Sequence, residues 1–298
     1  MRVFITGASG WIGSAVTAEL LTAGHDVVGL ARSPRSADVI AAAGAAVHRG
    51  SLDDLESLRK GAVDADAVIH LGFNHDFSDM AGAWRTERAV VETFLDVLEG
   101  SDRPFLLASG VAGLTPGRVA TENDASTQRG PDSMRGGAEN LARDHADRGV
   151  RSVGLRFAPT VHGEGDHGFV ATIARIARTT GVSGYVGDGS ARWPAVHRLD
   201  AAHLVRLALE GAPAGSVVHA VAEEGVPTRD IAEALRRGLG VPAASIDPAD
   251  VTEHFGWIGR FFSMDAPTSS TLTRELLGWE PTHPGLLDDI AAGYYTRD

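Results

Sequence analysis

The chain of 298 residues contains no cysteine, which excludes disulfide bonds, thiolate metal ligands and cysteine nucleophiles. No apolar run approaches the roughly 20 residues of a membrane-spanning helix. The opening segment MRVFITGASG has too short an apolar run before its first glycine to be a signal peptide. We therefore expect a cytoplasmic protein with no membrane partner.

Lysine and tyrosine are also scarce. Lysine occurs once, at Lys60, and tyrosine occurs only at Tyr185, Tyr294 and Tyr295. Because every tyrosine follows Lys60, the chain cannot contain a tyrosine four residues before a lysine. Acidic residues outnumber basic ones by 39 to 27, which gives a net charge of −12. This balance argues against a nucleic-acid partner, since such proteins usually carry a concentrated basic face.

Short apolar runs alternate with helical segments through the first half of the chain. The runs that predict strands are residues 2–5, 26–30, 45–48, 67–71, 105–108 and 151–155, and the helical segments are residues 11–23, 80–98 and 136–148. Strands that alternate with helices at this spacing indicate βαβ units with right-handed crossovers. The predicted fold class is α/β, with a Rossmann-type doubly wound parallel sheet.

The pattern changes after residue 156. We expect helices at residues 169–178, 200–209 and 228–239, with Thr228 as an N-cap and Asp230 in the first turn, and a short strand at 217–220. The last ~60 residues contain five prolines and predict irregular structure. Residues 1–160 are therefore interpreted as mainly a dinucleotide-binding domain. Residues 161–298 are interpreted as mainly a smaller, loop-rich substrate-binding portion, with some return to the first domain.

Residues 6–13 read TGASGWIG, directly after the first expected strand and at the start of a helix. Glycines spaced three apart allow a tight turn and a close approach of the backbone to a pyrophosphate, and the helix N-terminus offers unpaired N–H groups to the anion. An alternative is a glycine-rich turn without a ligand. The cofactor contacts predicted here are Gly7, Ser9, Gly10, Trp11, Ile12 and Gly13.

The end of the second expected strand carries no acidic residue. An acid there would bind a free ribose 2′-hydroxyl and repel a 2′-phosphate. The chain instead offers Arg32 and Ser33, whose guanidinium and hydroxyl groups suit a phosphate. We therefore favour NADP(H) over NAD(H), the alternative being that Arg32 is a solvated loop residue.

Six segments in order resemble an extended short-chain dehydrogenase/reductase of the NAD-dependent epimerase/dehydratase group. They span nearly the whole chain and read TGASGWIG, GSLD, AVIHL, LRFAPTVHG, RWPAVHRLD and LGWEPTHPGLLDDI. The first is similar to the family's TGxxGxxG, and the last to its closing LGW-x-P motif. The resemblance implies further cofactor contacts near adenine, the nicotinamide ribose and the nicotinamide, at Ser51, Leu52, Leu71, Gly72, Phe73, Pro159, Thr160 and Val161.

Members of this family use a serine, a tyrosine and, four residues after it, a lysine. Ser109 in FLLASG matches the serine, which positions the substrate oxygen in the family, and is predicted to be a catalytic residue and a cofactor contact. One register places Pro131 at the tyrosine and Arg135 at the lysine. A second places Arg135 at the tyrosine and Glu139 at the lysine. We prefer the first, because it leaves no gap before Arg156, and it makes Arg135 a cofactor contact; neither register supplies a phenol.

Another group must therefore act as the acid or base if the protein is an enzyme. Arginine stays protonated and is a poor candidate, whereas histidine titrates near neutrality. We predict His162 or Tyr185 as the catalytic acid or base, with His197 as the second choice among the histidines. The predicted substrate contacts are His162, Tyr185, Trp193 and His197. His70 is interpreted as a strand-end histidine with a satisfied hydrogen bond.

Imidazoles and carboxylates cluster from His162 to His167, but the family has a polar, glycine-rich loop there without metal, so no metal is expected. The chain contains no G-x-S-x-G nucleophile elbow, which argues against a serine hydrolase. The function favoured is an oxidoreductase or epimerase-like protein that acts by hydride transfer on a small hydroxyl- or carbonyl-bearing substrate. The alternatives are an NADP(H)-binding sensor or scaffold without redox turnover, and an isomerase or lyase. A homodimer through residues 80–98 and 136–148 would be usual for the family.

Overall fold

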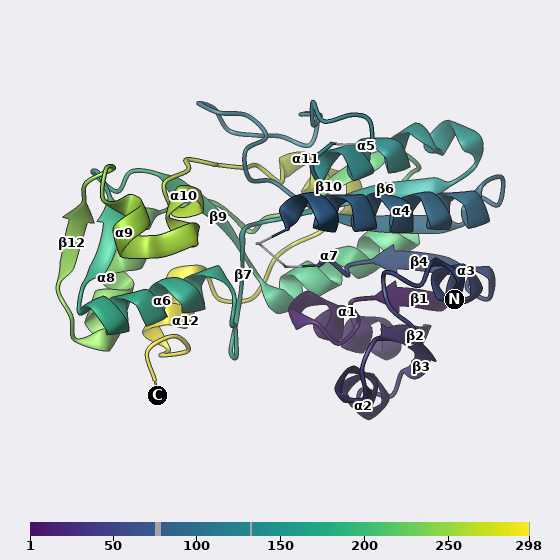
Figure 1. Ribbon diagram of the computed structural model, residues 1–298, viewed down its shortest axis with the longest axis horizontal. Helices are drawn as coiled ribbons and strands as arrows, with labels where there is room; N and C mark the ends of the chain where they lie inside the picture. Colours follow the sequence, from purple (N-terminus) through teal and green to yellow (C-terminus); the bar gives the residue numbers. More distant parts are fainter. Residues whose placement is uncertain (75–78, 132, 298) are drawn as a thin grey trace.

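A seven-stranded sheet forms one end of the molecule in the computed structural model (Figure 1). The strand order is β10-β6-β5-β4-β1-β2-β3. The structure describes residues 1–74, 79–131 and 133–297. All strand pairs of the sheet are parallel. The strands are β1 (Arg2–Thr6), β2 (Asp26–Ala31), β3 (Ala46–Arg49), β4 (Ala67–His70), β5 (Pro104–Gly110), β6 (Arg151–Phe157) and β10 (Ser216–Ala220). The order reverses between β1 and β4, where doubly wound sheets bind ligands. The predicted Rossmann-type sheet is confirmed.

Helices cover both faces of this sheet (Figure 1). One face carries α1 (Trp11–Thr22) and α7 (Arg198–Gly211), and the other α3 (Leu55–Val63), α4 (Met80–Leu98) and α5 (Gly136–Asp144). Side chains alternate along β1, so that Val3 and Ile5 pack in the core on the face covered by α1 and α7. Phe4 packs in the core on the opposite face. Burial on both faces explains why these strands read as continuous apolar runs. Helix α2 (Pro34–Ala42) links β2 and β3.

A smaller group of elements lies at the other end of the molecule (Figure 1). Its strands are β7 (Thr160–His162), β8 (Ser183–Val186), β9 (Arg192–His197), β11 (Glu223–Pro227) and β12 (Ala243–Ile246). Its helices are α6 (Phe169–Thr180), α8 (Thr228–Leu239), α9 (Val251–Phe255), α10 (Gly259–Phe262) and α12 (Leu286–Ala291). An aromatic core that includes Trp193, Phe255 and Phe262 holds them together. Helix α11 (Thr271–Leu277) returns to pack beside β10.

Three local predictions are wrong. Thr228 is the first residue of α8 and not its N-cap, which is Pro227, because the Thr228 hydroxyl is buried and donates to the Gly189 carbonyl. The helix predicted for residues 136–148 ends at Asp144, and a 3₁₀ turn then leads to Gly149 in the left-handed conformation. The last 60 residues are not irregular, since they contain four short helices and β12. None of the helices in the described residues combines the length and the apolar character of a membrane span.

Candidate functional site

The connection from β1 into α1 has room only for glycine at residues 7 and 13. Gly7 has a φ of +73°, and a Cβ atom on it would lie 2.7 Å from the backbone nitrogen of Gly72. A Cβ atom on Gly13 would lie 2.0 Å from the Gly7 carbonyl oxygen. No side chain caps α1 at Gly10, and its first turn contains no acidic residue. The turn therefore presents bare N–H groups and the positive end of the helix dipole, which fit an anion.

Two other segments come close to this turn. The backbone nitrogen of Gly72, which follows β4, donates to the Thr6 hydroxyl at 3.1 Å. The Trp11 indole donates to the Val161 carbonyl at 2.7 Å, so the start of β7 is fastened to the first turn of α1. The structure thus brings together the glycine turn, the end of β4 and the segment that starts at Pro159, as the family resemblance implies for a dinucleotide site.

Arg198, at the start of α7, adds a cation to the first turn of α1. Its guanidinium lies 4.2 Å above the Trp11 ring, and Nη2 donates to the Ser14 hydroxyl at 2.6 Å. Burial lowers the pKa of Arg198. Its Nε is buried and has no hydrogen-bond partner among the residues that the structure describes. A positive charge is therefore fixed beside the proposed anion site.

The predicted adenine-side residues lie at the ends of β2 and β3. Arg32 is exposed. The Ser33 hydroxyl accepts from the Ser36 backbone nitrogen at 3.2 Å and so caps α2. The Ser51 hydroxyl accepts from the Asp53 backbone nitrogen at 3.3 Å, and Leu52 packs against the core that α4 covers. Arg32 offers guanidinium donors at this edge, and the Ser33 and Ser51 hydroxyls, which act as acceptors in these two bonds, each keep an O–H group that can donate.

The predicted nicotinamide-side residues meet at the ends of β4 and β5. Arg135, at the N-terminus of α5, donates from Nη2 to the Ala108 carbonyl at 3.3 Å. Its guanidinium lies 4.4 Å above the Phe73 ring and bonds through Nε to Glu87 Oε1 at 3.1 Å. Ser109 directly follows Ala108 and is 7% exposed. The structure therefore brings Phe73, Ser109 and Arg135 into one place.

Burial perturbs two titratable groups beneath this place. It raises the pKa of Glu87 to about 7, and the positive charge of Arg135 opposes this effect. It lowers the pKa of His70 to about 3, and the Arg135 charge acts in the same direction. His70 Nδ1 lies 2.6 Å from the Thr6 hydroxyl. His70 is therefore neutral at physiological pH and hydrogen-bonded at Nδ1.

The pH dependence of stability should report on Glu87. A carboxyl group whose pKa rises on folding, here from 4.5 to about 7, binds its proton more tightly in the folded chain, so stability is lost as the pH rises through that interval. Replacing Glu87 with glutamine should remove roughly 2 kcal/mol of the stability loss between about pH 5 and pH 8.5. Urea unfolding at both pH values checks this result. The matched control is Glu92→Gln, because Glu92 lies on the same helix and is half-exposed. Equal pH dependence of stability in wild type and Glu87→Gln would contradict the prediction.

His162 and His197 lie together, each next in sequence to a residue that contacts the first turn of α1. His162 is fully buried, and its Nδ1 lies 2.6 Å from Asp289 Oδ2 in α12. The His197 ring lies edge-on to His162 at 5.5 Å and stacks on His283 at 4.7 Å. The His197 and His283 rings are within 6° of parallel. A metal ion bound by both imidazoles would have to lie in the plane of each ring, which this stacking does not allow. Asp200, the nearby carboxylate, already accepts from the loop that carries His283.

The other predicted substrate contacts lie in the smaller group of elements. Tyr185, in β8, has the Arg229 guanidinium 5.5 Å from its ring centre. Trp193, in β9, is 1% exposed and donates from its indole to the Phe261 carbonyl at 3.1 Å. Trp193 and His197 lie on the same strand, β9, whereas Tyr185 lies in the separate sheet of β8 and β12.

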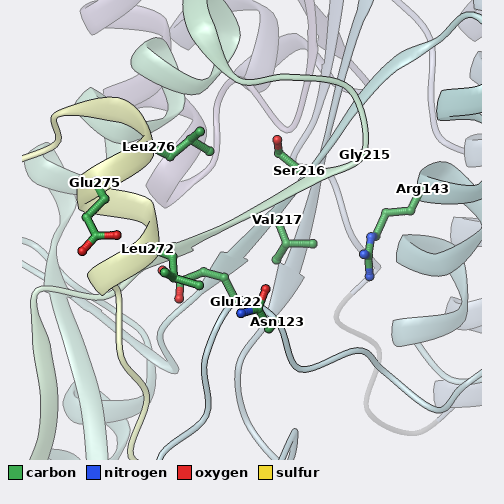
Figure 2. Close-up of a pocket in the computed structure, with 9 residues that line it drawn as sticks. All are labelled: Glu122, Asn123, Arg143, Gly215, Ser216, Val217, Leu272, Glu275 and Leu276. Atoms are coloured by element: carbon green, nitrogen blue, oxygen red, sulfur yellow. The ribbon is translucent and has the colours of Figure 1, made fainter.

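A groove of about 480 Å³ lies elsewhere, along the edge strand β10 (Figure 2). Figure 2 shows Arg143 of α5 on one side and Leu272, Glu275 and Leu276 of α11 on the other. It shares no residue with the glycine turn or with the surroundings of Arg135. The candidate cofactor site is therefore defined by the backbone turn and the strand ends, and not by this groove.

Glu87, Arg198 and Asp289 are not among the site residues predicted from the sequence. Glu87 had a visible signal, because it falls on the apolar stripe of α4 with Ala83, Val90, Val91 and Phe94. A charged residue on such a stripe predicts a buried partner. Arg198 and Asp289 had no such signal, because their partners lie more than a hundred positions away in the sequence.

Comparison with known proteins identifies the family. The model of the NAD dependent epimerase/dehydratase family matches residues 3–221. An uncharacterized protein of Schizosaccharomyces pombe is 46% identical over 296 residues, which cover 99% of this chain and 100% of that protein. One of Saccharomyces cerevisiae is 47% identical over 298 residues and 99% of each chain. The UDP-glucose 4-epimerase of Thermus thermophilus, solved with NAD, has a TM-score of 0.75 at 20% identity, with 99% of this chain and 98% of that one covered, and is similar in fold. The chain therefore belongs to the NAD dependent epimerase/dehydratase family.

Proposed function

We propose that the protein binds NADP(H) and catalyses hydride transfer with a small hydroxyl- or carbonyl-bearing substrate. The observation that carries the proposal is the uncapped start of α1, where Gly7 and Gly13 leave a cradle that a Cβ atom would fill. The nicotinamide, when bound, supplies the hydride acceptor or donor. The chain's own residues bind the pyrophosphate at the glycine turn, with Arg198 beside it, and orient the nicotinamide half at the ends of β4 and β5.

Arg135 supports the register in which it replaces the family's lysine. It lies with Ser109 and Phe73 at the strand ends, where that lysine would hold the ribose. Glu139, the lysine position of the other register, is instead 1% exposed and paired with Arg156 inside the protein. Arg135 can bind ribose hydroxyls or an anion but cannot exchange a proton near neutrality.

The proton-transfer step is assigned by this proposal to His162 or Tyr185. His162 has the carboxylate of Asp289 on Nδ1, which orients the ring and favours a proton on that nitrogen. Its Nε2 has no hydrogen-bond partner among the described residues and lies 3.8 Å from a carboxylate oxygen of Glu223. Tyr185 offers a phenol, with the cationic Arg229 beside its ring.

The preference for the 2′-phosphate is proposed to depend on Arg32. The variant Arg32→Glu should weaken NADPH binding by roughly tenfold or more, because it removes a charge-assisted contact and adds repulsion. NADH affinity should stay the same or rise. Isothermal titration of both cofactors measures this, with Arg260→Glu as a control of equal charge change on an exposed residue of α10. Equal losses for NADPH and NADH would contradict the assignment.

A second candidate function is an NADP(H)-binding sensor or scaffold without turnover. The observation that favours it is the sequence itself, in which no tyrosine stands four residues before a lysine. Thermal-shift titrations with the four oxidised and reduced cofactors test binding, since a ligand of the native state raises the melting temperature. Absorbance of NADPH across a panel of carbonyl substrates then separates the two functions. Consumption of NADPH with one substrate supports the enzyme, and binding without consumption supports the sensor.

A further inference from the structure

We propose that Glu87 is a positioning residue, which holds the Arg135 guanidinium against the nicotinamide half of the cofactor. The inference rests on the proposed function and goes beyond it, because Glu87 lies on α4, outside the segments that carry the family resemblance. The pair joins α4 to the N-terminus of α5 across the ends of β4 and β5.

Glu87 is an unusual residue for its place in the fold. Its side chain is 3% exposed, and it occupies the apolar stripe of α4. Oε1 accepts from Arg135 Nε at 3.1 Å, whereas Oε2 is buried and has no hydrogen-bond partner among the residues described. A buried carboxylate with an unused oxygen is costly, and an apolar side chain of similar size would be less so. The geometry therefore indicates a task that packing alone does not explain.

Arg135 is held from three directions. Glu87 fixes Nε, the Ala108 carbonyl accepts from Nη2 at 3.3 Å, and the Phe73 ring supports the guanidinium plane at 4.4 Å. The side chain is nevertheless 32% exposed, so part of it remains accessible to a ligand. A planar fork held in this way loses little freedom when it binds a ligand's hydroxyl or carboxamide oxygen.

The charges around the pair suit this role. Glu87, when ionised, neutralises Arg135, and its carboxyl group is buried. Among the residues that the structure describes, His70 of β4 is also linked to the pair, and it stays neutral because burial and the Arg135 charge lower its pKa. With its pKa raised to about 7, Glu87 is fully ionised only above neutral pH, and there the pair presents hydrogen-bond donors without adding a net charge to the site.

A positioning role and a merely structural role differ in the ligand that they affect. NADPH carries the nicotinamide half, whereas 2′,5′-ADP carries only the adenosine half with its phosphates. Loss of Glu87 should weaken NADPH binding roughly tenfold, which is about 1.4 kcal/mol, and leave 2′,5′-ADP affinity unchanged. A merely structural change would weaken the binding of both ligands equally, or of neither.

The experiment is a calorimetric titration of both ligands against wild type, Glu87→Gln, Arg135→Gln and the double variant. The double variant should bind NADPH no more weakly than Arg135→Gln, because Glu87 acts through Arg135. The control Glu92→Gln, whose carboxylate pairs with Arg88 on the outside of α4, should match wild type. If Glu87→Gln does not fold, Glu87→Asp keeps the charge but shortens its reach, and should weaken NADPH binding selectively.

Three outcomes would overturn the inference. Unchanged NADPH affinity in Glu87→Gln would do so, as would equal losses for the two ligands, or additive losses in the double variant. A wild-type protein that binds neither ligand contradicts the proposed function itself, and a wild-type protein that binds both while the variants lose both alike contradicts only the role of Glu87.

Discussion

Replacing Gly13 with alanine is expected to abolish NADPH binding and to lower the free energy of unfolding by about 3 kcal/mol. The new Cβ atom would lie 2.0 Å from the Gly7 carbonyl oxygen and 3.0 Å from the Ala8 Cα. Both neighbours are backbone atoms, so the clash cannot be relieved by turning a side chain. The start of α1 must move away from β1, and its N–H groups move with it.

Urea unfolding and a fluorescence titration with NADPH measure the two effects of Gly13→Ala. The matched control is Gly211→Ala at the end of α7, where an added Cβ atom meets no heavy atom within 4 Å. This control should bind as wild type and be at least as stable, because alanine favours the helix. A Gly13→Ala variant that binds NADPH with wild-type affinity would show that the turn is not the pyrophosphate site.

Among the substitutions predicted here, removal of the Glu139 carboxylate should lower the free energy of unfolding the most. Glu139→Ala is expected to lower the free energy of unfolding by about 3–5 kcal/mol, because it leaves Arg156 buried without its counter-charge. Arg156 is 0% exposed, and its Nε lies 2.9 Å and 3.1 Å from the two carboxylate oxygens of Glu139. This pair joins α5 to β6 beneath the candidate site.

A double variant separates the pair from its parts. Glu139→Met combined with Arg156→Met should lose less stability than Glu139→Ala, since no charge is left unpaired. Some loss should remain, because Arg156 also donates to the Asp124 carbonyl at 2.7 Å. Urea unfolding of the single and double variants checks the order. A loss below about 1 kcal/mol for Glu139→Ala would contradict the account, because it would make the pair equivalent to a surface ion pair.

The sheet and the glycine turn could be predicted from the sequence because both depend on local patterns. Val3, Phe4 and Ile5 are apolar in succession because helices cover both faces of β1. Gly7 and Gly13 lie only six positions apart, so a local sequence pattern specifies the cradle. The confirmed fold and family thus follow from features that span a few residues each.

The rest of the candidate site depends on contacts between distant parts of the chain. Trp11 and Val161 are 150 positions apart, and Ser14 and Arg198 are 184 apart. No periodicity links such residues, so the cation beside α1 could not be predicted. The short strands at the second end of the molecule, such as the three residues of β7, are likewise fixed by pairing with distant strands and not by their own pattern.

The central claim is that this chain holds a nicotinamide dinucleotide at the start of α1. A fluorescence titration of NADPH against the wild-type protein, with NADH as the paired ligand, tests it most directly. The account predicts saturable binding of one NADPH per chain, tighter than NADH, and its loss in Gly13→Ala. The absence of saturable binding by either cofactor to the folded wild-type protein would contradict it.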